Sequence, residues 1–368
     1  MSQQAQSLTG IALQKFKKNF WGVFSFGFIV LVLFVAIFAY VLAPDASENA
    51  NQMHLSIYSK SPGFEVKMLV IPQEGEISKS FKNYFVGHPN QSTEIPISSY
   101  KILDDKIQYV EYSDDPSLQL TKEMSLDKFP RNTDFKKIEE ELIVTKKFIL
   151  GTDKYGRDLL SRMIIGSRVS ISIGFVAVLI SVIVGLFFGA MGGYYGGKVD
   201  AFVMWLVNVI WSIPTLLLVI AITLAIGKGF WQVFVAVGLT MWVEVARVVR
   251  GQIISIKEMQ YVTAARALGF SNPRIIINHI LPNIMAPVIV ISAANFASAI
   301  LVESGLSFLG LGAQPPIPSW GGMIKDHYNY IILGKPYLAL VPGTAIMLIT
   351  LAFMMTGNAL RDALDVKS

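Results

Sequence analysis

Long uncharged apolar runs constrain this sequence more than any other feature. A helix needs roughly 20 residues to cross the hydrocarbon core of a bilayer. Five apolar runs reach about 18 residues or more, and a sixth run at 229–243 can be extended to about residue 249. We therefore expect an all-α polytopic membrane protein with six transmembrane helices. The five long runs cover 19–44, 169–197, 201–227, 280–302 and 336–360.

The composition also fits a membrane protein. Of the 368 residues, 53% are hydrophobic and 15% are charged, against about 25% charged in soluble proteins. Segment 44–150 holds 17 acidic and 13 basic residues, a net charge of −4, so the rest of the chain carries +9. Those Lys and Arg residues stand at the ends of the apolar runs, as in membrane proteins generally. We expect the lipid bilayer, and no nucleic acid, as their partner.

Metal and disulfide chemistry find little support in the sequence. There are no cysteines, which excludes disulfides and thiolate metal sites. The histidines do not have the spacing of metal ligands, so we expect no metal and no cofactor bound by this chain. The four histidines are His54, His88, His279 and His327.

The first apolar run is expected to be a retained membrane helix. It follows three lysines, as a signal peptide would, but it is about 25 residues long, against 7–15 in a signal peptide. The Lys and Arg bias between short loops places both termini in the cytoplasm and segment 44–150 outside. A basic cluster before the second run also falls outside, and its alternation with Asp153 and Asp158 predicts an ion-paired interfacial helix. The cluster is Lys154, Arg157, Arg162 and Arg168.

Segment 44–150 is polar and interrupted by prolines, and it forms an insert between the first two spans. Alternating runs at 64–71 and 106–112 predict β-strands, because period two turns one face of a strand toward a core. The insert can form a small β-containing domain, or it can lie as irregular structure across neighbouring subunits. The predicted domains are therefore 1–43, 44–150 and 151–368. No internal repeat is evident.

The stretch GGYYGGKV at 192–199 fits the spacing of a phosphate-binding loop, except that Val199 replaces the Ser or Thr that holds magnesium. A working loop follows a buried strand, whereas this stretch follows an apolar run that is too long for a strand. We predict a turn between two membrane helices, with Lys198 reaching the interface and Asp200 opening the next helix. The chain is expected to have no ATPase site of its own.

A patterned polar stretch, EMQYVTAARALGFSNPRIIINHILPN at 258–283, separates the fourth and fifth spans. Apolar residues recur there every three positions, which predicts one apolar face of a short helix at about 256–270. Gly269 is a natural helix stop, and Asn272-Pro273 marks a turn into a second helix. A helix on the lipid surface would fit, but the small residues Ala264, Ala265 and Ala267 favour close packing against protein. The recurring residues are Ile256, Met259, Val262, Ala265 and Leu268.

This stretch resembles the EAA cytoplasmic loop of ABC-importer permeases, although Thr263 replaces the Glu and His279 replaces the Ile of that consensus. Two further blocks, at 150–174 and 303–324, resemble signature stretches of the C-type permease subunit of dipeptide and oligopeptide importers. The tail LRDALDVK resembles that of the same subfamily, with Val366 where Pro is usual. The resemblance covers about 1–43 and 148–368. Residues that match the EAA consensus are Ala264, Ala265, Gly269, Leu281 and Pro282.

The resemblance implies the type I ABC-importer permease fold and a division of labour. Such a subunit pairs with a homologous second permease, two ATP-binding cassette subunits dock below, and an extracytoplasmic binding protein delivers cargo. ATP and magnesium are then used by the partner ATPases, and the loop at about 250–282 transmits their closure to the spans. The residues that the resemblance places in this coupling loop are Met259, Tyr261, Val262, Thr263, Ala264, Ala265, Ala267, Leu268, Gly269, Leu281 and Pro282.

Several residues inside the spans are candidates for a hinge or a transport pathway. Pro214 removes a backbone hydrogen bond and predicts a kink, which fits either a hinge or a packing kink. Glu244 and Arg247 are spaced to pair on one helix face. Polar groups in spans can line a path or bond to neighbouring helices. The other candidates are Asn208, Trp211, Asn295 and Glu303, the last expected near the outer surface.

The function we expect is that of a permease subunit of an ATP-driven importer for di- or oligopeptides in a bacterial inner membrane. The chain itself would not be an enzyme. Nickel or another small solute stays open as cargo. An ion-coupled secondary transporter would need charges near the bilayer midplane and usually repeats. A membrane sensor would need a cytoplasmic output domain, and an exporter is disfavoured by the three signature blocks.

Overall fold

The structure is a computed structural model that describes residues 8–72, 83–89, 92–103, 106–125, 129, 138–227 and 229–364. The chain divides into two compact units. We call them the helical unit (Met1–Leu33, Ser170–Gln314 and Gly343–Ser368) and the mixed unit (Phe34–Val169 and Pro315–Pro342). The end of the C-terminal tail, including Val366, and Lys228 lie outside the described residues.

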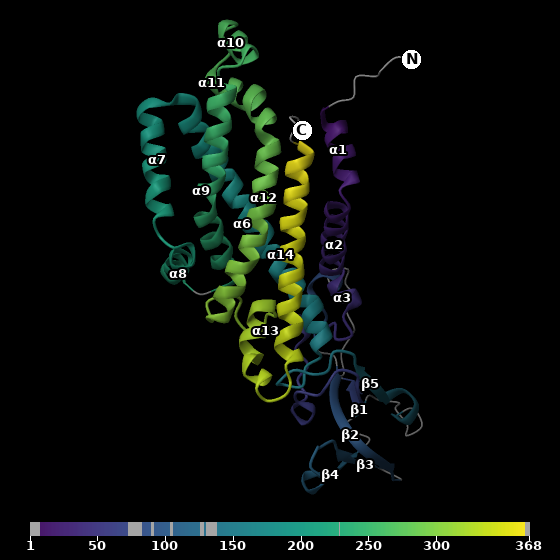
Figure 1. Cartoon of the computed structure of the whole chain (residues 1–368). Coiled ribbons are helices and arrows are strands. Elements are labelled where there is room, and N and C mark those ends of the chain that lie inside the picture. The colour runs from purple at the N-terminus through teal and green to yellow at the C-terminus, as the bar shows by residue number, and fades with distance from the viewer. Residues whose placement is uncertain are drawn as a thin grey trace, which may run out of the picture. The chain divides into compact units, whose positions relative to one another are not determined.

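Helices dominate the chain, and five of those described are long and apolar enough to cross a membrane (Figure 1). These five are α2 (Phe20–Ile37), α6 (Leu159–Tyr195), α9 (Phe230–Ile256), α12 (Leu281–Phe308, continuous with the residues from Asn272) and α14 (Tyr337–Leu364). The other α-helices of the described residues are α1 (Leu8–Lys18), α3 (Ala39–Leu42), α4 (Asn83–Val86), α7 (Gly197–Trp211), α8 (Thr215–Ile226), α10 (Gln260–Ala267), α11 (Asn272–Ile275) and α13 (Trp320–His327).

The predicted third span, 201–227, is not one straight helix. The chain forms α7 and α8 there, and the two axes meet at 92°. The break falls at Pro214, which has an extended backbone (ψ 124°) and precedes α8, because a proline cannot continue the helical hydrogen bonds. The predicted kink is confirmed, but α7 alone is only about 22 Å long and too short to span. The count is therefore five spans, or six if the bent pair makes one.

Residues 192–199 form a helix, a turn and a second helix, as predicted. Helix α6 ends at Tyr195, and Gly196 (φ 66°) and Gly197 (φ 51°) turn the chain into α7. The glycines before this turn bring α6 against α9, because a Cβ on Gly189 or Gly193 would lie within 3 Å of a backbone carbonyl of α9. Small residues allow such close approach between membrane helices. Helix α6 also begins ten residues before the predicted boundary.

The mixed unit contains a five-stranded antiparallel sheet of order β4-β3-β2-β1-β5. The strand predictions at 64–71 and 106–112 are confirmed by β1 and β3. Met68 and Leu69 are adjacent, point to opposite faces, and are both fully buried in separate hydrophobic clusters, so the sheet is covered on both sides. The strands are β1 (Phe64–Pro72), β2 (Ser92–Ile102), β3 (Lys106–Glu111), β4 (Thr121–Ser125) and β5 (Ile143–Phe148).

A partly buried ionic cluster joins this sheet to the chain that precedes it. The Glu94 carboxylate on β2 lies 2.8 Å from the Lys146 ammonium on β5 and 3.3 Å from the His54 imidazole. Burial alone would raise the pKa of Glu94, but the neighbouring His54 and Lys146 outweigh it and lower the pKa to about 2 from 4.5. The ionised carboxylate is therefore part of the folded state.

The pKa of Glu94 predicts an acid-sensitive sheet. Because the folded-state pKa is lowered, ionised Glu94 stabilises the folded chain above pH 4.5, and this stabilisation is lost as the pH falls toward about 2. We expect the full-length protein in membrane vesicles to become protease-sensitive within the mixed unit over this range. Glu94→Gln should be less stable than wild type at neutral pH and should lose less on acidification. Parallel acid titrations of the two proteins would contradict the assignment.

Candidate coupling site and pathway residues

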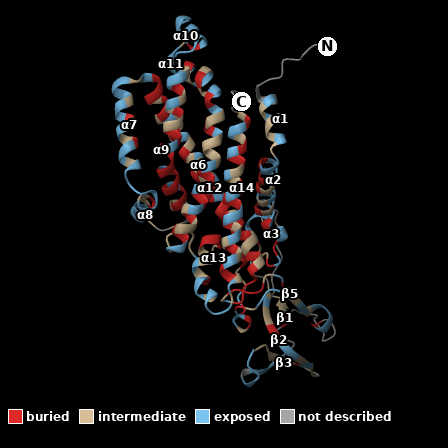
Figure 2. Ribbon diagram, in the orientation of Figure 1, coloured by how far each residue is buried: buried red, intermediate tan, exposed pale blue. Residues whose placement is uncertain are grey.

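Helix α10 is anchored to the ends of α9 and α12. Val262 and Ala265 are its buried residues, and they join a hydrophobic cluster with Val249 and Ile253 of α9 and Ile284 of α12. The rest of α10 is exposed at one end of the helical unit (Figures 1 and 2). The buried side of α10 therefore belongs to the same hydrophobic cluster as parts of α9 and α12.

The predicted helix at 256–270 is shorter than expected, and its predicted apolar face is confirmed only in part, since Val262, Ala265 and Ile256 pack in one hydrophobic cluster. Ile256 is the last residue of α9, and the chain leaves the helical conformation before α10 begins at Gln260. Met259 and Leu268 flank α10 and are 49% and 74% exposed, so the recurrence every three residues combined two different elements. The exposed residues of the predicted coupling loop are Met259, Tyr261, Thr263, Ala264, Ala267, Leu268, Gly269 and Pro282.

Gly269 ends α10 in a Schellman motif. Its N–H donates to the Arg266 carbonyl at 3.0 Å, and the Phe270 N–H donates to the Ala265 carbonyl at 3.2 Å. Gly269 has φ +78°, the left-handed region that favours glycine, and a Cβ there would meet nothing within 4 Å. The predicted helix stop is confirmed, and the need for glycine comes from the backbone alone.

Side-chain contacts hold the turn after Gly269. The Phe270 ring stacks on the His279 imidazole with centroids 5.7 Å apart, and the Arg274 guanidinium lies 4.5 Å from the Phe270 centroid. The hydroxyl of Tyr194, at the end of α6, donates to the Asn272 side chain at 2.8 Å. His279, which departs from the EAA consensus, thus stabilises the turn by stacking.

The chain enters α12 without a break. A π-helical segment, Ile276–Ile280, joins α11 to Leu281, and Pro282 is the second residue of α12. Ile280 and Ile284 are fully buried in the cluster that holds α10. The predicted second helix before the fifth span is confirmed in this form.

Helix α7 of the bent pair is tied to α9 by polar contacts. Asp200 accepts two hydrogen bonds from Arg250, at 2.5 and 2.6 Å. Arg247 donates to Asn208 at 3.2 Å, and its guanidinium lies 3.5 Å from the Trp211 ring. Among the described residues Arg247 forms no ion pair with Glu244, which differs from the predicted pairing, because α7 offers it an amide and an aromatic face.

Asn295 and Glu303 lie on the buried side of α12. They are 1% and 0% exposed, and the Ser307 hydroxyl donates to the Glu303 carboxylate at 2.6 Å. Neither amide atom of Asn295 has a hydrogen-bond partner among the described residues. Neither residue lines the cavity between α9, α12 and α14 or the cavity beside Pro214. A pathway role for Asn295 and Glu303 stays a prediction. A pathway residue must be accessible to the cargo, whereas both side chains are buried within this chain.

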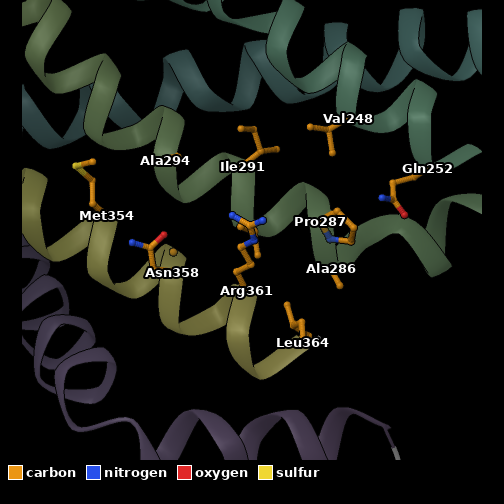
Figure 3. A pocket seen from close by; sticks show the side chains of 12 residues that line it. Val248, Gln252, Ala286, Pro287, Ile291, Ala294, Met354, Asn358, Arg361 and Leu364 are labelled. Carbon is orange, nitrogen blue, oxygen red and sulfur yellow. The ribbon is translucent and has the colours of Figure 1, made fainter. Parts of the chain in front are cut away.

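Two cavities in the described part of the helical unit lie near the candidate residues or between the long helices. The smaller, about 180 Å³, is lined beside the break at Pro214 by Trp211, Thr215, Glu244 and Ser298, among others. The larger, about 620 Å³, lies between α9, α12 and α14, and Arg361 reaches into it from α14 (Figure 3). The sequence predicted neither cavity, because each is formed by side chains far apart in the chain.

Within the block at 150–174, Asp153, Arg157 and Arg162 form a buried ion-pair cluster in the mixed unit. Asp153 is fully buried and accepts hydrogen bonds from the Tyr155 N–H (2.8 Å) and the Arg157 side chain (2.6 Å), and the Arg162 Nε lies 3.6 Å away. Arg157 also donates to Asn51 at 3.0 Å. The alternation of charges signalled ion pairing, but most of it lies in a loop before α6 rather than in an interfacial helix.

Two family models match the chain. Residues 164–367 match the binding-protein-dependent transport system inner membrane component, and residues 7–62 match the N-terminal transmembrane domain of oligopeptide transport permease C. A solved structure of the MetNI methionine ABC transporter in an inward-facing conformation aligns with a TM-score of 0.46 and 18% identity, over 55% of this chain and 96% of that chain.

Curated relatives agree with these models. The dipeptide permease DppC of Alkalihalophilus pseudofirmus is 42% identical over 217 residues, 59% of this chain and 71% of that protein. The oligopeptide permease OppC of Bacillus subtilis is 35% identical over 61% and 73%, and the glutathione permease GsiD of Pectobacterium atrosepticum is 38% identical over 59% and 72%. The resemblance stated from the sequence is confirmed. The chain belongs to the family of inner membrane components of binding-protein-dependent transport systems, which are ABC-importer permeases.

Proposed function

We propose that this chain is the C-type permease subunit of an ATP-driven importer and forms half of the translocation pathway for di- or oligopeptides. The observation that carries the proposal is the 42% identity to a dipeptide permease over most of that relative's length. The chain makes and breaks no covalent bond in this scheme, and ATP with magnesium is bound and hydrolysed by partner subunits.

The proposed assembly pairs this chain with a homologous second permease, two ATP-binding cassette subunits and an extracytoplasmic substrate-binding protein. The exposed surface of α10 supports the contact with an ATPase subunit. Met259, Tyr261 and Leu268 present apolar area there, and Ala264 and Ala267 leave room for a close neighbour. A groove on the ATPase would bury this area and move α10 together with α9 and α12.

The proposed topology places both termini in the cytoplasm of a bacterial cell and the β-sheet insert outside. Lys15, Lys17 and Lys18 stand in the last turn of α1, before the apolar α2, and Arg361 stands in the last turn of α14. Both positions agree with the excess of positive charge on the cytoplasmic side. In this topology the cavity beside Arg361 and helix α10 belong to the cytoplasmic half.

The proposed pathway residues surround the break in the bent pair. Pro214 would act as the hinge, because α7 and α8 are separate rigid helices on either side of it. Asn208 and Trp211 would follow Arg247 of α9 when α9 moves. Asn295 and Glu303 would become accessible only if α12 separates from its neighbours.

Affinity purification of the full-length tagged chain from native membranes tests the assembly. We expect a homologous permease and one or two ATPases with phosphate-binding loops to co-purify. The variant Leu268→Asp is purified in parallel. It adds a charge at the exposed C-terminal end of α10, so it should still co-purify with the second permease but no longer with the ATPases. Recovery of the chain alone under mild conditions would contradict the proposal and would favour a secondary transporter or a sensor.

A further inference from the structure

The larger cavity of the helical unit is a wedge between α12 and α14, with α9 as its third wall. Helices α12 and α14 touch where Phe296 stacks on Phe353 at 3.9 Å and where a Cβ on Gly357 would lie 3.2 Å from Ala293. Beyond this contact the helices diverge toward the C-terminal end of α14, and the cavity of about 620 Å³ fills the space. It is large enough for an organic ligand.

Polar groups in this cavity are few, and Asn358 and Gln252 lie on opposite sides of Arg361 (Figure 3). Arg361 is the one charged residue among those that line the cavity, and Asn358 and Gln252 supply the amides (Figure 3). Within the described residues none of the three side chains forms a hydrogen bond or an ion pair. A guanidinium offers five donors in a planar fork that matches phosphate and carboxylate groups. The cavity thus offers binding to an anion.

The remaining lining is hydrocarbon, which limits what the anion can be attached to. Apolar side chains continue along both helices past Arg361, among them Val290, Ile291 and Ala294 of α12 and Met354 of α14. A peptide lying there would leave its backbone N–H and C=O groups without partners, and each such group costs free energy. An acyl chain has no such groups. The polarity therefore favours an amphiphile with an anionic head.

We infer that this cavity binds one anionic phospholipid, with its phosphate on Arg361 and an acyl chain along α12 and α14. In the proposed topology the head lies at the cytoplasmic surface, where basic pockets between helices meet anionic lipid heads. The lipid would fill the wedge beside Gln252, one turn from the end of α9 that leads to α10. The inference goes beyond the proposed function and holds whichever cargo is carried.

Native mass spectrometry of the full-length protein with its co-purifying partners tests this site. Phosphatidylglycerol is the probe, with phosphatidylcholine and sn-glycerol 3-phosphate as head and tail controls. We expect one phosphatidylglycerol to bind per chain, and the other two probes to bind about tenfold more weakly or not at all, since each lacks the net anionic charge or the acyl chain. Equal retention of phosphatidylcholine would refute anion recognition, and equal binding of glycerol phosphate would reassign the site to a free anion.

Three variants locate the bound lipid. Arg361→Gln should weaken phosphatidylglycerol binding about tenfold, Arg361→Lys should restore part of it, and Ala294→Phe should remove it by filling the apolar end. Lys257→Gln is the matched control, because Lys257 is a cation at the end of α9 that does not line the cavity. Unchanged binding in Arg361→Gln would overturn the inference. Displacement of the lipid by a labelled dipeptide would instead make the cavity a cargo site.

Discussion

Gly269→Val should stop transport while leaving the chain inserted and associated with its partners. Valine at φ +78° is strained, because left-handed backbone costs an L-residue roughly 1–2 kcal/mol and a β-branched residue more. The chain can relieve this strain only by giving up the two hydrogen bonds that end α10. The angle between α10 and α12 would then change, and ATPase closure would no longer reach α12. We expect at least a tenfold loss of ATP-driven peptide uptake with ATP hydrolysis retained.

Gly269→Asn separates this explanation from a steric one. Asparagine adopts the left-handed conformation more readily than other L-residues, and the space around a Cβ at this position is open. The asparagine variant should therefore keep most of the uptake, although it too adds a side chain with a Cβ. Uptake and ATP hydrolysis are both measured in proteoliposomes with the complete assembly. Equal loss in both variants, or normal uptake in Gly269→Val, would contradict the role given to the turn.

Asp153→Asn should strongly destabilise the mixed unit. The change removes one negative charge and leaves Arg157 and Arg162, each 4% exposed, without the carboxylate they share. Removing one partner of a buried ion pair costs about 3–5 kcal/mol, because the remaining charge is buried without compensation. Arg157 also holds Asn51, and Arg162 lies against the carbonyls of Asn49 and Ala50, so the segment before the sheet should loosen as well.

The matched control is Asp326→Asn in the same unit. Asp326 pairs with Lys154 at 3.0 Å, and both side chains are partly exposed. Such pairs contribute about 0–1 kcal/mol. Thermal unfolding of the full-length protein should therefore show a fall of several degrees for Asp153→Asn and almost none for Asp326→Asn. Similar unfolding temperatures for the two variants would show that the ion-pair cluster around Asp153 contributes no more stability than a partly exposed ion pair.

Hydropathy predicted most of the spans because a bilayer demands long apolar helices with every backbone group bonded. The bend between α7 and α8 escaped this reasoning. The run 201–227 is apolar on both sides of Pro214, and a proline permits either a slight kink or a complete break. The sequence also did not reveal the contacts that hold α7 against α9, those of Asp200 and Arg247. A sequence pattern does not encode such contacts.

The coupling loop shows the same limit at shorter range. The end of α10 at Gly269 was predictable, because few residues other than glycine adopt a positive φ readily. The N-terminal end of α10 was not, since Ile256 and Met259 continue the spacing of Val262 although the chain leaves the helix between them. Only two strands of the sheet were predicted. In β2, β4 and β5, additional polar residues interrupt the alternation of apolar and polar positions. Pairing across the chain then decides which faces are buried.

ATP-driven uptake of a labelled dipeptide into proteoliposomes tests the central claim most directly. The vesicles contain this chain, its co-purifying permease and ATPases, with the external binding protein added, and matched vesicles lack this chain alone. We predict uptake that requires ATP on the ATPase side, requires the binding protein, and disappears when this chain is omitted. Uptake that persists without this chain, or uptake by this chain alone driven by an ion gradient without ATP, would contradict the account.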